Sequence, residues 1–175
     1  SNYYSRGLEL CETLVKIHPK EPRGNAVYAD FLLLGGKLKD AAKYIPAATQ
    51  IHALDIGCAA GYCLEVMNKK GWIAKGLELD EEMCKRLQKS GFDFSRSSIE
   101  DFKTENKFSV ITLFDVIEHI PNIDIAFSKF NSLLAKDGVV IMVTPNYNSF
   151  QRKLLGKRWF QYKPIEHIQY FDENS

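Results

Sequence analysis

The sequence predicts a doubly wound α/β fold with a mostly parallel sheet, preceded by a helical extension. Three observations support this: helical periodicity fills the first ~45 residues, short apolar runs then alternate with amphipathic segments, and a turn of small residues follows the first apolar run. Such alternation favours a parallel sheet covered on both faces, with right-handed crossovers. We therefore expect helices over 1–48 that pack on or cap the core, and an α/β domain over 49–175.

The composition limits the kinds of partner. Hydrophobic residues make up 45% and charged residues 26% of 175 residues, and the formal net charge of +1 draws the chain neither to nucleic acid nor to an anionic membrane. No apolar run reaches the ~20 residues of a membrane span. Four cysteines lack zinc-ligand spacing, so we expect reduced thiols in a cytoplasmic protein and no bound metal. They are Cys11, Cys58, Cys63 and Cys84.

The N-terminal segment contains two predicted helices. In the first, Leu8, Cys11 and Leu14 recur at helical spacing before Pro19. A second helical stretch is interrupted by two adjacent glycines and ends before Pro46.

Strands and helices then alternate. The first helix after residue 51 ends at Gly71, the second runs from an Asp80 N-cap to Gly91, and the third places Phe127, Phe130 and Leu134 on one face. The predicted strands cover residues 51–55, 72–78, 92–96, 108–114 and 139–143.

The turn after the first strand is the first candidate for ligand binding, because ligands of open α/β sheets lie at the carboxyl ends of strands. Two glycines and two alanines, Gly57, Ala59, Ala60 and Gly61, keep the turn thin enough for the main chain to approach a ligand, and the following helix offers free N–H groups. A dinucleotide is disfavoured because the GxGxxG pattern is missing.

Two carboxylates flank this turn. Asp55 would oppose a pyrophosphate but suits an ammonium or a sulfonium group, and the alternative is a carboxylate that caps the turn. Glu78, at the end of the second strand, can accept both hydroxyls of an adenosine ribose. Its alternative is a solvated charge at the strand end.

Residues 51–146 resemble the class I S-adenosylmethionine (SAM)-dependent methyltransferases, which have a Rossmann-like fold. LDIGCAAG at 54–61 is similar to the DxGxGxG turn of that family, and GLE at 76–78 is similar to its ribose-binding strand end. SIEDF at 98–102 falls at the adenine-side loop, and FSVITLFDVIEHIP at 108–121 is similar to the fourth strand with its loop. LLAKDGVVIMVTPN at 133–146 resembles the passage around the fifth strand.

The resemblance implies SAM as cofactor, S-adenosylhomocysteine (SAH) as product, and a set of cofactor contacts. Glu78 would hold the ribose, Leu79 and Ile99 would enclose the adenine, and the Glu100 side would contact its amino group. The turn would pass beneath the methionine portion, with Asp55 on the ammonium side. The further cofactor contacts implied are Gly57, Cys58, Ala59, Gly61, Tyr62, Ser98 and Phe114.

Asp115 and His119 are the candidate catalytic residues, since the resemblance places them near the methyl donor. His119 could act as a base if the acceptor is a hydroxyl, or it could pack and position the cofactor loop. Asp115, Glu118 and His119 have i, i+3, i+4 spacing and would share one face of a helical turn. This run is similar to the EVVEH-like stretch of quinone-biosynthesis O-methyltransferases, whose acids can hold a divalent cation; no metal is predicted for this chain.

The aromatic segment 159–171 resembles a "P-x-H-hydrophobic-x-x-F" stretch of methyltransferases that act on small molecules and cell-envelope glycans. This implies acceptor contacts at Trp159, Tyr162 and His167, with a small-molecule or glycan acceptor methylated on O or N. The alternative is an aromatic cluster that packs the end of the sheet.

Nucleic acid is not expected as a partner. The [DNS]PP[YFW] motif of amino-group nucleic-acid methyltransferases is missing after the fourth strand, and the basic residues at 152–158 are interpreted as a solvated helix face. The oligomeric state is not predicted.

The sequence also raises a question of completeness. The family's sheet has seven strands and five are counted here, so the final antiparallel strands are expected to be missing and the domain to be incomplete at its C-terminus. Ala59 and Ser109, which depart from the family pattern, keep a catalytically silent SAM-binding or scaffold domain as the alternative function.

Overall fold

The computed structural model describes residues 50–172 of the chain. The predicted helical domain over 1–48, with Cys11, lies outside these residues. The domain boundary near residue 48 therefore stays a prediction.

The described residues form one sheet of five strands in the order β3-β2-β1-β4-β5, and every neighbouring pair is parallel. The order reverses at β1, because the chain adds β2 and β3 on one side and then returns to add β4 and β5 on the other. This confirms the predicted fold class and puts the binding crevice at the carboxyl ends of β1 and β4. The strands are β1 His52–Ile56, β2 Ile73–Glu78, β3 Phe94–Arg96, β4 Phe108–Phe114 and β5 Leu134–Val143.

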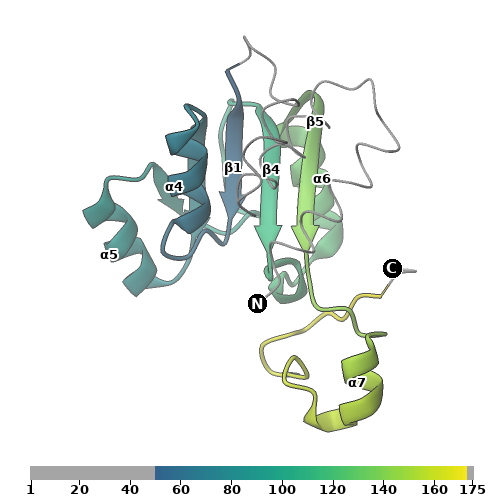
Figure 1. The fold of residues 1–175 in the computed structure, drawn as a ribbon. Helices are drawn as coiled ribbons and strands as arrows, with labels where there is room; N and C mark the ends of the chain where they lie inside the picture. The colour runs from purple at the N-terminus through teal and green to yellow at the C-terminus, as the bar shows by residue number, and fades with distance from the viewer. Residues whose placement is uncertain (1–49, 173–175) are drawn as a thin grey trace, which may run out of the picture.

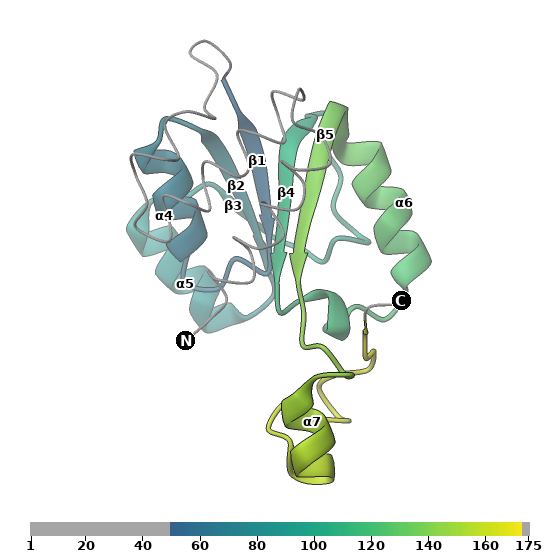
Figure 2. The ribbon, with the colours of Figure 1, turned by 45° about the vertical axis from the view of Figure 1, so that its right-hand side comes forward.

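Helices cover both faces of the sheet. Figure 2 shows α4 and α5 on one side and α6 on the other, as expected of a doubly wound fold. The helices are α4 Tyr62–Lys69, α5 Glu81–Ser90, α6 Ile123–Leu133 and α7 Phe150–Leu155, with short 3-10 turns η1 Ile117–His119 and η2 Gly156–Arg158.

The core consists of two apolar clusters, one on each face of the sheet. Successive residues of a strand point to opposite faces. In β1, Ala53 therefore joins the cluster containing Leu64 of α4, while Leu54 joins the cluster containing Phe130 of α6. Because the central strands are buried on both faces, they read as continuous apolar runs in the sequence.

The predicted ends of α5 are confirmed. Asp80 accepts a hydrogen bond from the Met83 N–H at 2.9 Å, which satisfies one of the free donors of the first turn. Gly91 ends the helix with φ 73°, a left-handed conformation that favours glycine.

The predicted apolar face of α6 is confirmed at two of its three positions. Phe127 and Phe130 lie in the helix with their ring centroids 5.5 Å apart, although Phe127 is exposed, whereas Leu134 is the first residue of β5. Asn122 caps the N-terminus of the helix by accepting the N–H of Ile125. The buried face of α6 consists of Ala126, Phe130 and Leu133.

The strand bounds agree with the prediction at β4 and shift by one or two residues in β1, β2 and β3. The largest difference is in β5, which begins five residues earlier than the predicted 139. Leu134 pairs with Phe108, and the register then shifts before Val139 pairs with Val110.

The chain beyond β5 folds back toward the sheet. Figure 1 shows α7 beyond the carboxyl ends of the strands, apart from the layers. The returning chain is held where Asn146 forms a parallel bridge with Phe171, and the Tyr147 N–H donates to the Phe171 carbonyl at 2.7 Å. None of the helices within residues 50–172 has the length and apolar character needed to span a membrane.

Candidate active site

A pocket of about 610 Å³ lies at the carboxyl ends of β1 and β2 and beside the loop after β4. It adjoins the crevice between β1 and β4, where the reversal of strand order predicts a ligand. Its walls are mostly apolar, with polar groups from β2 and from the loop after β3. It is lined by Ile56, Gly57, Leu77, Glu78, Leu79, Ser97, Ser98, Ile99, Glu100, Asp101, Val116, His119, Ile120 and Pro121.

The turn after β1 needs its glycines. Gly57 has φ 67° and Gly61 has φ 85°, and both are packed against side chains. An added Cβ would lie 2.4 Å from Val116 Cγ2 at position 57, and 2.8 Å from Leu87 Cδ2 at position 61. Ala59 also has positive φ, at 46°. The turn therefore keeps its close approach to neighbouring elements although its middle residue is not glycine.

Glu78 joins this turn to the end of β2. One carboxylate oxygen accepts the N–H of Ala59 at 2.8 Å, and the other accepts the N–H groups of Leu79 at 2.7 Å and Asp80 at 2.8 Å. Neither interpretation from the sequence included these main-chain contacts. A carboxylate has about four lone-pair sites, so with three N–H groups bound Glu78 keeps about one site for a hydroxyl of a ligand.

Asp55 lies inside the sheet and not at the surface of the turn. It is 3% exposed, and it pairs in register with Thr112 of β4, whose hydroxyl donates to its carboxylate at 2.6 Å. Burial raises the pKa of Asp55 to about 7, although hydrogen bonds from Thr112 and Cys63 act to lower it. The hydrogen bond from Thr112 ties β1 to β4.

The loop after β4 does not form the predicted common face. Asp115 has φ 53°, outside the right-handed helical region, and the helical turn covers only Ile117–His119. The side chain of Glu118 points inward and is 1% exposed, and burial raises its pKa. The side chain that lies beside Glu118 and His119 is His167, whose ring centroid is 4.8 Å from that of His119.

The C-terminal segment is anchored to this loop by main-chain contacts. The N–H groups of Ile168 and Gln169 donate to the Glu118 carbonyl at 3.0 and 3.1 Å. His119 Nδ1 lies 2.7 Å from the carbonyl oxygen of Glu166. The loop beside the pocket and the segment that the sequence assigned to the acceptor side are therefore in direct contact.

Comparison with known proteins decides the family. A family model described as a methyltransferase domain matches residues 19–175. The chain belongs to the class I SAM-dependent methyltransferases. SAM is the methyl donor of this family.

The matched relatives of this methyltransferase domain include ubiquinone biosynthesis O-methyltransferases. The protein of Actinobacillus pleuropneumoniae is 32% identical over 105 residues, 53% of this chain and 45% of that protein. The protein of Pasteurella multocida is 26% identical over 169 residues, 78% of this chain and 70% of that protein. In the first relatives matched, the chain spans less than half of the curated protein's length.

Solved structures agree on the fold. SAM-bound CalS10, an amino pentose methyltransferase from Micromonospora echinaspora, has a TM-score of 0.54 at 16% identity, covering 83% of this chain and 52% of that one. DesVI of Streptomyces venezuelae has a TM-score of 0.53 at 22% identity, covering 80% of this chain and 58% of that one.

The methyltransferase domain brings the predicted adenosine contacts together. Glu78, Leu79, Ser98, Ile99 and Glu100 all line the pocket, with Gly57 from the turn. Leu79 is 60% exposed, whereas Ile99 is buried and belongs to the core cluster on the α6 face of the sheet.

Other predicted contacts lie outside the lining of this pocket. Cys58 is buried, and its sulfur packs where a Cβ of Gly76 would lie. Burial raises the pKa of this thiol to about 12, with repulsion from Asp55 and Glu78. Tyr62 is largely exposed on α4.

The remaining predicted site residues lie at the end of β4 and in the aromatic segment 159–171. Phe114 ends β4, and Asp115 follows with a buried carboxylate oxygen that has no hydrogen-bond partner among the described residues. Trp159 is buried against Tyr147 and Phe160, which fits the packing interpretation. Tyr162 stacks on Tyr170 at 5.8 Å between ring centroids and is partly exposed.

Sequence reasoning missed two threonines that hold the acidic residues. Thr112 donates to Asp55, and Thr144 donates to Glu118 at 3.0 Å. Thr112 lies inside the buried strand β4 and Thr144 directly follows β5. A buried hydroxyl needs a hydrogen-bond partner, and this rule could have pointed to both threonines from the sequence.

Proposed function

We propose that this chain binds SAM in the pocket at the carboxyl ends of β1 and β2 and transfers its methyl group to a small-molecule or glycan acceptor. The observation that carries the proposal is the pocket itself, which is lined by the carboxylate-bearing Glu78 together with the apolar residues Leu79 and Ile99. Such a combination suits a ribose with an attached adenine.

The residues of the turn fit the rest of the cofactor. Added Cβ atoms at Gly57 and Gly61 would collide with their neighbours, so the main chain here is thin and fixed. The following helix α4 directs free N–H groups toward the turn, where they suit the carboxylate of the methionine portion. Asp55, buried beneath the turn, supplies a negative charge on the ammonium side once it is ionised.

When bound, SAM supplies a methyl group on a sulfonium, with a neutral sulfide as leaving group. The protein's main contribution is then positioning, because methyl transfer is an in-line displacement. A hydroxyl acceptor must also lose a proton. His119 is the residue placed for this role, since it lines the pocket and its Nδ1 is engaged by Glu166, leaving Nε2 as the free nitrogen.

An oxygen acceptor is the first to test, because the matched relatives are named ubiquinone biosynthesis O-methyltransferases. The segment after β5 contacts the loop beside the pocket, which supports an acceptor site between the two. We retain the cytoplasm as the predicted location.

The silent alternative predicts cofactor binding without turnover. Its sequence argument rested partly on Ala59, yet the main chain at Ala59 keeps the left-handed conformation that a glycine would adopt.

The test is methyl transfer from isotopically labelled SAM to a panel of phenols, catechols, amino sugars and glycans, read as labelled product and as SAH formed. Labelled product from one acceptor class, reduced in His119→Ala and retained in His52→Ala, supports the proposal. Binding of SAM without product from any class favours the silent domain.

A further inference from the structure

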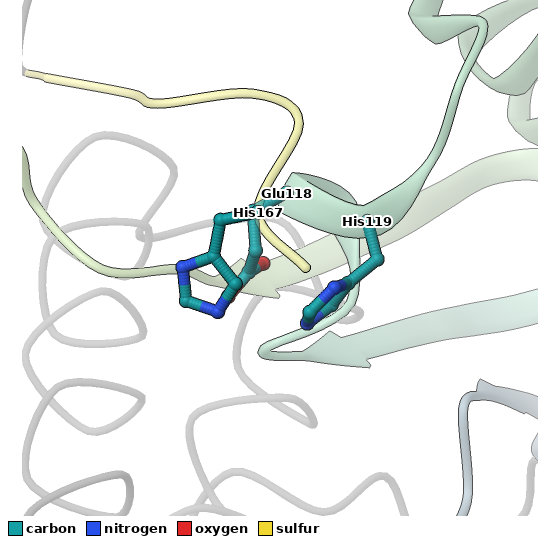
Figure 3. Close-up of side chains that lie close together, drawn as sticks. All are labelled: Glu118, His119 and His167. Carbon is teal, nitrogen blue, oxygen red and sulfur yellow. The ribbon is translucent and has the colours of Figure 1, made fainter. Parts of the chain in front are cut away.

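A row of aromatic side chains leads from the pocket along the returning C-terminal segment. His119 lines the pocket, and its ring centroid is 4.8 Å from that of His167. Figure 3 shows these two imidazoles side by side, with Glu118 next to them. The ring of Tyr170 is 6.2 Å from that of His167 and 5.2 Å from that of Tyr147, which follows β5. We call His119, His167, Tyr170 and Tyr147 the aromatic row.

The aromatic row contains two buried polar atoms without a partner. The hydroxyl of Tyr170 and Nδ1 of His167 form no hydrogen bond with any group of residues 50–172. Buried polar atoms normally have a partner. A bound molecule with polar groups would supply one for each of these atoms.

Arg152 of α7 lies at the far end of the aromatic row. Its guanidinium carbon is 4.0 Å from the centroid of the Tyr147 ring, and its Nη2 donates to the Tyr147 hydroxyl at 2.5 Å. Arg152 is half-buried, whereas Lys153, Lys157 and Arg158 are exposed, as expected of a solvated face.

The guanidinium of Arg152 is held in place without a carboxylate. None of the ion pairs among residues 50–172 includes Arg152. A guanidinium offers five N–H donors in a planar fork that matches a carboxylate or a phosphate. An anion from outside the chain therefore fits this position.

The pocket and the segment after β5 carry opposite charges. No Lys or Arg lines the pocket, and its carboxylates are those of Glu78, Glu100 and Asp101. This suits SAM, whose sulfonium and ammonium groups outweigh its carboxylate. Residues 147–170 contain five Lys or Arg and a single acid, Glu166, which Lys163 engages at 2.9 Å. The formal net charge of +1 conceals this separation, which attracts a cation to one side and an anion to the other.

We propose that the aromatic row is the acceptor subsite and that Arg152 binds a carboxylate or phosphate group of the acceptor. The inference rests on the proposed function and narrows the acceptor to anionic molecules. The acceptor lies along the aromatic row, with the atom to be methylated at His119 and its anionic group at Arg152. Arg152 determines specificity and takes no part in the transfer of the methyl group.

This subsite includes one of the three acceptor contacts that the resemblance implies, His167. Trp159 packs against Tyr147, and Tyr162 stacks on Tyr170, so both support the aromatic row from its sides.

The test is calorimetric titration of the SAH-saturated protein with two matched pairs of probes. One pair is protocatechuate and its neutral amide, and the other is phenyl phosphate and phenol. Wild type is expected to bind the anionic member of at least one pair about tenfold or more tightly than the neutral member, as a hydrogen bond to a charged group requires. The pair that shows the preference tells a carboxylate from a phosphate.

Three variants assign the preference to a residue. Arg152→Gln is expected to bind both members of the pair within about threefold of each other, because its side chain is uncharged. Arg152→Lys keeps the charge without the planar fork and is expected to lose about half of the preference or more. Lys153→Gln removes an exposed charge from the same helix and should keep the preference of wild type.

Equal binding of both members of both pairs by wild type would overturn the inference. So would a preference that survives in Arg152→Gln, or one that Lys153→Gln loses equally. SAH binding and circular dichroism are measured on every variant, and Arg152→Lys decides if Arg152→Gln does not fold. Wild type that binds SAH without a preference contradicts the acceptor subsite alone, whereas wild type that does not bind SAH contradicts the proposed function as well.

Discussion

The carboxylate of Glu78 accepts the main-chain N–H of Ala59 at 2.8 Å, across 19 residues of sequence. The end of β2 thereby holds the turn after β1 in place, and the same carboxylate also receives the N–H groups of Leu79 and Asp80. Glu78 therefore has a structural role in addition to the proposed ribose contact.

Replacing Glu78 should weaken the protein even without ligand. Glu78→Ala leaves three N–H groups without their acceptor, so we expect a loss of about 1–3 kcal/mol in the free energy of unfolding, measured in urea. Glu100→Ala, at another acidic residue lining the pocket, should change it by no more than about 0.5 kcal/mol. Equal effects of the two substitutions would show that the hydrogen bonds of Glu78 contribute nothing to stability.

Restoring a glycine in the turn should stabilise it. Ala59 has φ 46°, where a Cβ costs about 1–2 kcal/mol, and Ala59→Gly removes that cost against a smaller gain in the entropy of the unfolded chain. We expect a net gain of about 0.5–1 kcal/mol by urea unfolding. The reverse exchange, Gly57→Ala, should destabilise, because its Cβ would meet Val116 at 2.4 Å. A destabilised Ala59→Gly variant would contradict the left-handed turn.

Asp55 should make stability depend on pH. Its pKa is raised from 3.8 to about 7 by burial, so between these values the unfolded chain loses the proton while the native protein keeps it. Stability falls as pH rises through this window, by up to about 4 kcal/mol, and is constant above it.

The Asp55→Asn variant isolates this effect, since it keeps an acceptor for Thr112 and cannot ionise. Urea unfolding from about pH 4 to pH 8 should show the variant gaining on wild type as the pH rises. Parallel curves for the two proteins would mean that Asp55 ionises normally in the fold.

Replacing Leu79 should weaken cofactor binding and leave the stability of the fold unchanged. It is 60% exposed in the wall of the pocket, so a charge there meets little of the core. Leu79→Glu is expected to weaken SAH binding about tenfold or more by calorimetry, with the unfolding temperature of the free protein unchanged. Leu154→Glu on α7, where Leu154 is 71% exposed, is the matched control and should bind SAH as wild type does. Equal affinities in the two variants would remove Leu79 from the site.

The sheet was predictable from the sequence because its central strands are buried on both faces. The run at 108–114 has the bounds predicted for β4, and Asp80 and Gly91 mark the ends of α5. The junction of α6 and β5 was not predictable, since apolar residues continue through it. Pairing of Leu134 with Phe108 decides where the strand begins, and that contact is distant in sequence.

The candidate site was predictable in part. Glu78 ends β2 and Ile99 follows β3, and the carboxyl ends of these strands meet at one edge of the sheet, so their place at the pocket could be inferred from topology. That Glu118 and His167 lie close together could not be inferred from the sequence, because it depends on how an irregular segment returns to the loop after β4. No periodicity encodes such a return, and the left-handed φ of Asp115 broke the helical spacing on which the predicted face relied.

The central claim is that the pocket binds SAM, and thermal unfolding with and without SAH tests it most directly. NAD serves as the control ligand, and each variant is compared with its own unliganded form because Glu78→Ala also affects stability. With SAH at about 100 times its dissociation constant, binding adds roughly 2.7 kcal/mol, a rise of about 5–10 °C for wild type. We predict this rise with SAH alone and its loss in Glu78→Ala. No rise with SAH, or an equal rise with NAD, would contradict the account.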